Sequence, residues 1–107
     1  MYPRLVINLE KIRQNVRAMR ALTSKAGLEM GIVTKSFTAD RKIVETVVDE
    51  GVDFLADARI ANIKSYVDLP VKKLLLRIVQ DCEIEEVIKY ADISLNSEIE
   101  TIRKMDK

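Results

Sequence analysis

Histidine is absent from this sequence, and cysteine occurs only once. Without histidine, the common zinc hydrolase sites and the Ser-His and Cys-His nucleophile pairs are excluded. The single cysteine, Cys82, excludes an internal disulfide and a cluster of thiolate ligands. We therefore expect no metal site, and the default location of such a chain is the reducing cytoplasm. Lysine, arginine and the carboxylates remain as the side chains with catalytic chemistry.

Glycine-rich motifs, long apolar runs and an excess of one charge are missing as well. The three glycines are widely separated and match neither the dinucleotide-binding nor the P-loop pattern. No apolar stretch approaches the roughly 20 residues that cross a bilayer, and the first residues lack the apolar core of a secretory signal. Eighteen basic and seventeen acidic residues are interleaved and leave a net charge of +1. We expect neither nucleic acid nor a membrane as a partner.

What the sequence does contain is an alternation of short apolar runs and helical patterns. In the clearest helical pattern, Asn8 offers an N-cap, apolar residues follow at spacings of three and four over 9–26, and Gly27 stands where a left-handed cap belongs. Residues 43–48 are rich in β-branched side chains, which favour a strand. Their spacing is helical, however, and Asp40 can cap the segment, so we predict a helix there.

The whole pattern predicts an α/β fold. Strands are expected at residues 5–7, 30–33, 52–56, 74–78 and 92–95. Helices are expected at residues 9–26, 40–50, 59–67, 83–90 and 97–105. Ser97 and Glu100 have the S-x-x-E spacing of a capping box. The alternation implies a parallel sheet covered by helices, either doubly wound or part of a closed (β/α)8 TIM-type barrel. Because a full barrel needs about 250 residues, this chain supplies roughly half of one.

Polar side chains recur at the ends of the predicted strands, which form the working edge of parallel β/α folds. Lys35 follows a buried strand, where desolvation favours the neutral amine of Schiff-base chemistry; the alternative is a solvated loop lysine. Arg77 either binds a carboxylate, phosphate or ring oxygen, or forms an internal ion pair, for example with Asp57. Asp57 is otherwise a helix cap. Asn96 and Ser97 are candidate donors to an anion, although Ser97 is also explained as an N-cap.

Several stretches follow one another in an order and spacing that a known family shares. They are residues 5–9 with Ile12, Arg13 and Asn15, then residues 31–35, 51–57 and 91–102. The first resembles the opening of alanine-racemase-like enzymes, in which a strand ending in lysine follows the first helix. The last two look closest to the ornithine-racemase-like branch. The chain is thus identified as resembling the alanine racemase N-terminal-domain-like family over essentially its whole length.

The resemblance implies that residues 1–107 are the N-terminal portion of a fold-type III β/α barrel that binds pyridoxal 5′-phosphate. It implies that Lys35 is the Schiff-base lysine and one acid/base of an amino-acid racemase. The anion-binding candidates Arg77, Asn96 and Ser97 are then assigned to the cofactor, and Asp57 to the substrate. A homo-oligomer is expected, because the partner subunit completes the site in alanine racemases proper.

Two departures from the family pattern modify this expectation. Residues 36–40 follow the lysine where alanine racemases have a segment ending in Tyr-Gly, which weakens an assignment to alanine. The later barrel strands lie outside residues 1–107, so we expect the chain alone to be inactive. Two alternatives remain open: a carrier or homeostasis protein for the cofactor, and a non-catalytic βα module that self-associates through open sheet edges.

Overall fold

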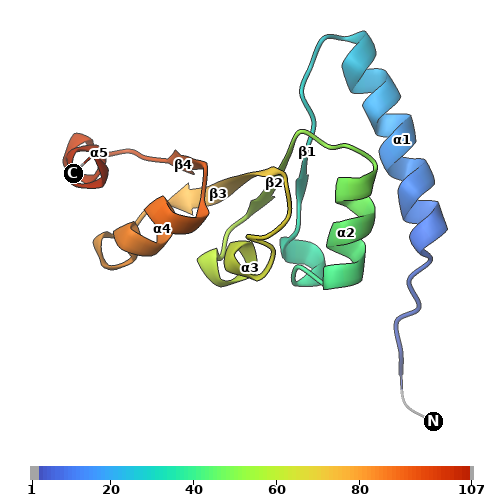
Figure 1. Ribbon diagram of the computed structural model, residues 1–107, viewed down its shortest axis with the longest axis horizontal. Helices are drawn as coiled ribbons and strands as arrows, with labels where there is room; N and C mark the ends of the chain where they lie inside the picture. The colour runs from blue at the N-terminus through green and yellow to red at the C-terminus, as the bar shows by residue number, and fades with distance from the viewer. Residues whose placement is uncertain (1–2, 107) are drawn as a thin grey trace.

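In a computed structural model, residues 3–106 form four parallel strands that alternate with helices (Figure 1). The strands, in the spatial order β1-β2-β3-β4, are β1 (Gly31–Val33), β2 (Phe54–Asp57), β3 (Lys72–Ile78) and β4 (Ile93–Leu95). The helices are α1 (Leu9–Lys25), α2 (Arg41–Asp49), α3 (Ile60–Ser65), α4 (Ile84–Tyr90) and α5 (Ile99–Met105), with short 3-10 helices η1 (Lys35–Phe37) and η2 (Asp81–Glu83). Each predicted βα unit from β1 onward is therefore present.

Helix α1 begins and ends as the sequence predicts. The side chain of Asn8 accepts a hydrogen bond from the backbone N–H of Lys11 at 3.1 Å, which satisfies one free donor of the first turn. At the other end, Gly27 adopts a φ of +73°, and the N–H of Leu28 returns to the carbonyl of Thr23 at 2.8 Å. This is the left-handed termination that glycine permits.

Helix α2 confirms that spacing outweighs β-propensity in residues 43–48. Asp40 Oδ1 accepts a hydrogen bond from the N–H of Ile43 at 3.3 Å and caps the helix. Ile43, Val44 and Val47 are buried on one face of the helix. A helix with 3.6 residues per turn brings these three side chains to one face, where they pack into the core beside the sheet. The burial stabilises the helix although β-branched residues favour strands.

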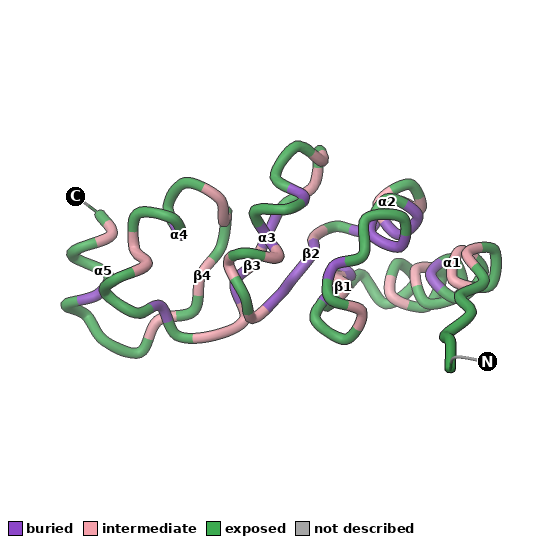
Figure 2. The backbone as a smooth tube through the Cα atoms, turned by 90° about the horizontal axis from the view of Figure 1, so that it is seen from below, coloured by how far each residue is buried: buried purple, intermediate pink, exposed green. Residues whose placement is uncertain are grey.

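The helices cover one face of the sheet. Leu55 of β2 and Leu75 of β3 are fully buried there, against residues of α2, α3 and α4 such as Val44, Ile63 and Val87. Figure 2 shows that the buried residues concentrate around β2 and its neighbours, while the outer segments are largely exposed.

Large apolar side chains remain exposed on the strands themselves. They are Val33, Ile78, Ile93 and Leu95, with exposed fractions between 40% and 55%. The radius of gyration is 15.6 Å, compared with about 13 Å for a compact domain of this length. The fold is therefore an open arc with one covered face and one face, hereafter the open face, that carries these apolar residues.

Two local predictions are wrong. Residues 5–7 form no strand: the segment is extended, and Leu5 and Val6 are 85% and 76% exposed, because no neighbouring strand among residues 3–106 pairs with them. The capping box does not form either. Helix α5 has Glu98 at its N-cap without a side-chain hydrogen bond, and Glu100 accepts a bond from Arg103 at 2.6 Å instead.

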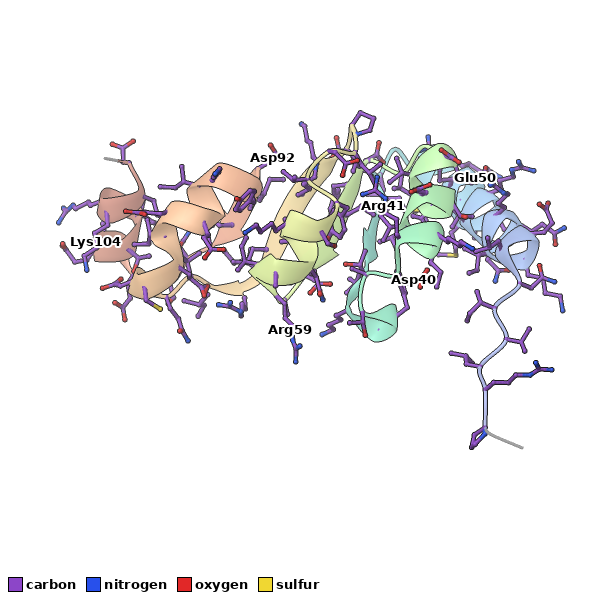
Figure 3. The ribbon with its side chains drawn as sticks, turned by 60° about the horizontal axis from the view of Figure 1, so that its bottom comes forward. Asp40, Arg41, Glu50, Arg59, Asp92 and Lys104 are labelled. Carbon is purple, nitrogen blue, oxygen red and sulfur yellow. The ribbon has the colours of Figure 1, made fainter. Side chains whose placement is uncertain are left out.

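The surface charges pair locally along the arc and do not gather at one place (Figure 3). Arg17 lies 2.7 Å from Glu50, and Arg41 binds Asp68 at 2.6 Å. Such exposed pairs contribute little to stability. Among the described residues, no helix is long and apolar enough to cross a membrane.

Candidate functional site

The polar residues that the sequence singles out all lie at the C-terminal ends of the strands, on one edge of the parallel sheet. Lys35 follows β1, Asp57 ends β2, Arg77 lies near the end of β3, and Asn96 and Ser97 follow β4. The parallel order β1-β2-β3-β4 places these four ends side by side. The edge that carries them is the one where β/α folds hold their ligands.

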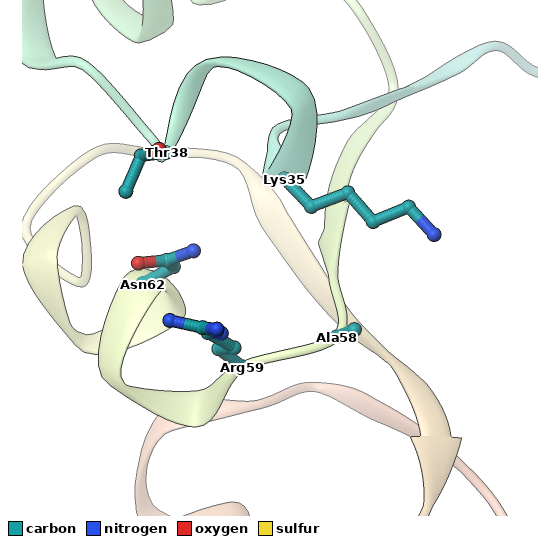
Figure 4. A pocket seen from close by; sticks show the side chains of 5 residues that line it. All are labelled: Lys35, Thr38, Ala58, Arg59 and Asn62. Carbon is teal, nitrogen blue, oxygen red and sulfur yellow. The ribbon is translucent and has the colours of Figure 1, made fainter.

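Lys35 is exposed and borders a hollow of about 310 Å³. The hollow is lined by Lys35, Thr38, Ala58, Arg59 and Asn62 (Figure 4). In Figure 4 the Lys35 side chain extends away from Thr38 and Asn62. Among residues 3–106, no carboxylate forms an ion pair with Lys35. Lys35 is therefore the solvated lysine of the alternative interpretation and not a desolvated one, and its amine is accessible to a small molecule at this edge.

Asp57 occupies a different environment from Lys35. Its carboxylate is fully buried on the helix-covered side of the sheet. Oδ1 accepts a hydrogen bond from the N–H of Arg59 at 2.8 Å, and Oδ2 accepts bonds from Thr34 Oγ1 at 2.6 Å and Asn62 Nδ2 at 3.1 Å. The helix-cap alternative is wrong: Arg59 is the N-cap of α3 and has no side-chain hydrogen bond, and Asp57 closes the turn that precedes the helix. Contact between Asp57 and a substrate stays a prediction.

Arg77 forms an internal ion pair, but its partner is Glu83 and not Asp57. The guanidinium binds both carboxylate oxygens of Glu83, with Nη2 at 2.8 Å from Oε2, and Nε donates to the carbonyl of Ala58 at 2.6 Å. The hydrogen bond from Arg77 lowers the pKa of Glu83, and the same bond raises the pKa of Arg77. Arg77 thus ties the β2–α3 loop to η2, next to the hollow at Lys35.

Asn96 and Ser97 lie apart from the hollow at Lys35. Asn96 lines a second hollow of about 290 Å³ together with Ser94, Ile102, Met105 and Asp106. Its Nδ2 donates to Ser94 Oγ at 3.0 Å, whereas its Oδ1 is buried and has no donor among the described residues. Ser97 is exposed. The strand ends therefore form two neighbouring groups, one around Lys35 and one around Asn96.

Sequence reasoning missed the buried polar residues behind Lys35. Thr34 and Tyr66 are both fully buried, and Thr34 Oγ1 lies 3.2 Å from Tyr66 Oη. In the sequence, Tyr66 lies within the helix predicted at residues 59–67, and no motif marks it as part of a site. The one available signal was a threonine directly after an apolar strand, since a hydroxyl buried there must find a partner.

Comparisons with known proteins show which proteins this chain is related to. No family model matches it. It is 44% identical over 107 residues to ornithine racemase of Acetoanaerobium sticklandii, and 32% identical over 111 residues to lysine racemase of Thermotoga maritima. The chain is homologous to these two racemases over its whole length, which supports its resemblance to the alanine racemase N-terminal-domain-like family. Both alignments include the whole chain but only 30% and 31% of the relatives, so the chain spans about a third of their length.

A solved structure shares the fold of this chain. The D-threonine aldolase from Filomicrobium marinum superimposes with a TM-score of 0.80 over 98% of this chain and 30% of that chain. The sequences are 16% identical, so the likeness concerns the fold alone. The predicted fold class, parallel strands alternating with helices as in part of a β/α barrel, is confirmed.

Proposed function

We propose that this chain forms the part of a pyridoxal-phosphate-dependent amino-acid racemase that holds the cofactor, with Lys35 as the lysine that binds it covalently. The observation that carries the proposal is the accessible Lys35 amine at the C-terminal edge of the sheet, in a chain that is 44% identical to an ornithine racemase. The names of the relatives support an amino acid with a basic side chain as substrate.

The residues around Lys35 fit such a cofactor. A volume of about 310 Å³ lies at the lower end of the range for small-molecule sites, roughly 300 Å³ upward. Arg59 and Asn62 supply N–H donors, and Thr38 supplies a hydroxyl, at the border of this hollow. Asn96 lines the second hollow, at the end of β4, and its buried Oδ1 is free to accept a hydrogen bond from a donor group of a ligand there.

When bound, the cofactor withdraws electrons from the α-carbon of an amino acid and so acidifies its α-proton. The residues of this chain orient the reaction and carry the proton. Lys35 Nζ would hold the cofactor covalently, and its amine would serve as one acid/base that takes up or returns the α-proton. We assign Arg77, Asn96 and Ser97 to cofactor contacts. Arg77 acts from a position fixed by Glu83 and the Ala58 carbonyl.

We infer that residues 1–107 by themselves hold only part of the catalytic centre and do not racemise amino acids. Two observations support this: the open face of the sheet, and the 30% of the relatives' length that the chain spans. An α-proton exchange assay in deuterated water with ornithine, lysine and alanine tests it. Exchange by the isolated chain above the rate with cofactor alone would refute the inference.

The assignment of Lys35 is tested by incubating the chain with pyridoxal phosphate, reducing with borohydride and mapping the modified lysines by mass spectrometry. We expect Lys35 to carry most of the label and Lys35→Ala to remove it. Lys42 is also exposed and lies nearby in the first turn of α2, so Lys42→Ala is the matched control and should leave the labelling of Lys35 unchanged. Equal labelling of many lysines would contradict the proposal. Binding without α-proton exchange in the complete protein would favour the cofactor carrier.

The open face favours a second candidate, a self-associating module. The accessible surface is 7611 Å², whereas a compact protein of 12.2 kDa exposes about 6,100 Å². The excess exceeds the roughly 800 Å² that each partner buries in a standard interface. Homo-oligomers are accordingly expected in sedimentation velocity. A monodisperse monomer across the accessible concentration range would count against this candidate.

A further inference from the structure

The residue directly before Lys35 is the centre of a buried hydrogen-bonded chain that crosses three elements. Thr34 Oγ1 lies 2.6 Å from Asp57 Oδ2 and 3.2 Å from Tyr66 Oη. Thr34, Asp57 and Tyr66 are all fully buried, and they come from the end of β1, the end of β2 and the C-terminal cap of α3.

The hydroxyl protons of Thr34 and Tyr66 determine which group donates in each of these hydrogen bonds. Thr34 has a single hydroxyl proton. Its oxygen lies 2.6 Å from Asp57 Oδ2 but 3.3 Å from the Ala56 carbonyl, so the hydroxyl donates to Asp57. Tyr66 must then donate to Thr34 Oγ1. Burial raises the pKa of Tyr66, so its phenol keeps the proton that this bond requires. The order of donation is Tyr66 to Thr34 to Asp57.

The main chain of Thr34 is held as firmly as its side chain. Its N–H donates to the Ala56 carbonyl at 2.8 Å, and its carbonyl accepts from the N–H of Ala39 at 2.9 Å. These bonds close the short loop that carries Lys35. Within the loop, Thr38 and Ala39 have φ angles of +52° and +53°, a conformation that residues with a Cβ rarely adopt. Such strain persists only where the surroundings enforce it.

We propose that the hydrogen bonds Tyr66–Thr34–Asp57 position Lys35. They anchor the strained loop, so that the lysine side chain leaves it at the C-terminal edge of the sheet. Thr34 and Tyr66 act through the backbone of the loop, and Asp57 takes part here as the acceptor of the Thr34 hydroxyl. The inference rests on the proposed function of Lys35 and adds to it the residues that orient this lysine.

The test compares Thr34→Val, which removes the hydroxyl at nearly constant volume, with Thr34→Ser, which keeps it. Tyr66→Phe removes the donor to Thr34 and retains the ring. Tyr90→Phe is the matched control, because Tyr90 lies on α4 and its ring contacts Lys64 and Lys89. Each variant is treated with pyridoxal phosphate and borohydride, and the label on Lys35 is divided by that on Lys42. Thermal unfolding is recorded in parallel.

We expect the ratio to fall about tenfold in Thr34→Val, equivalent to about 1.4 kcal/mol, and to fall in Tyr66→Phe. Thr34→Ser and Tyr90→Phe should retain the wild-type ratio. If Thr34→Val and Tyr66→Phe lower the melting temperature but keep the ratio, the bonds only stabilise the fold and the inference is refuted. A loss in Thr34→Ser as large as that in Thr34→Val would refute it as well.

Failure of the proposed function would show itself differently, as unselective labelling of the wild type. Amide hydrogen exchange over residues 35–39 then decides the positioning role, because it requires no cofactor. Faster exchange in Thr34→Val and Tyr66→Phe, with unchanged exchange in Thr34→Ser and Tyr90→Phe, would support the anchoring of the loop. Equal exchange in all five proteins would overturn it.

Discussion

Gly31 of β1 and Phe54 of β2 are directly opposite each other in the sheet, and this pair predicts a change in stability whose sign depends on the background. A Cβ added at Gly31 would overlap the ring of Phe54. The backbone of Gly31 lies in a strand and outside the left-handed region, so alanine is otherwise allowed there. The effect of Gly31→Ala on stability therefore depends on the Phe54 ring.

The magnitude follows from two opposing effects. Overpacking costs about 1–3 kcal/mol, while replacing glycine within a strand regains about 0.5–1 kcal/mol of conformational entropy. Gly31→Ala alone should lower the free energy of unfolding by up to about 2.5 kcal/mol. In the Phe54→Ala background the overlap is gone, and the same substitution should raise it by about 0.5–1 kcal/mol.

Urea denaturation followed by circular dichroism measures the four proteins of this cycle, with an unchanged m value as the check for two-state unfolding. Gly27→Ala is a useful control. Gly27 has a φ of +73° and no atom within 4 Å of an added Cβ, so its cost should be the same in both backgrounds. An equal effect of Gly31→Ala with and without the Phe54 ring would refute the reasoning.

Three further predictions concern the edge of the sheet. Arg77 lowers the pKa of Glu83 from its ordinary value of 4.5. The stability that this ion pair supplies is therefore complete above about pH 4.5 and is lost as the pH falls through the lowered pKa. Glu83→Gln should flatten the acid side of the profile of melting temperature against pH, and an unchanged slope would contradict this. Thr38→Gly should be neutral or stabilising by up to about 1 kcal/mol in urea, since it releases left-handed strain, and a clear loss of stability would count against strain at Thr38. Leu95→Lys, on the exposed edge strand β4, should weaken self-association in sedimentation velocity, and unchanged association would place the contact elsewhere.

The sequence alone was sufficient for the elements whose determinants are local. The side chain of Asn8 and the positive φ of Gly27 delimit α1, and the helical spacing of residues 43–48 identified α2 although their branching favours a strand. A cap or a period depends on residues within a few positions of one another. Parallel strand ends share an edge by topology, so the location of Lys35 at that edge was predictable too.

Tertiary structure decided the features that depend on distant partners. Residues 5–7 have the composition of a strand but find no neighbour to pair with among residues 3–106. Glu83 rather than Asp57 binds Arg77, because η2 brings its carboxylate to the end of β3. A sequence pattern does not state which of several carboxylates a guanidinium will reach.

The environment of Lys35 shows the same division most clearly. The sequence determined that a lysine follows the first strand of the sheet, and the resemblance to a racemase family predicts a role for it. Only the folded chain brings Tyr66 and Asp57, 32 and 23 residues away from Thr34, into contact with the residue before Lys35. Burial of a polar group requires a partner, but the fold alone decides which residues supply it.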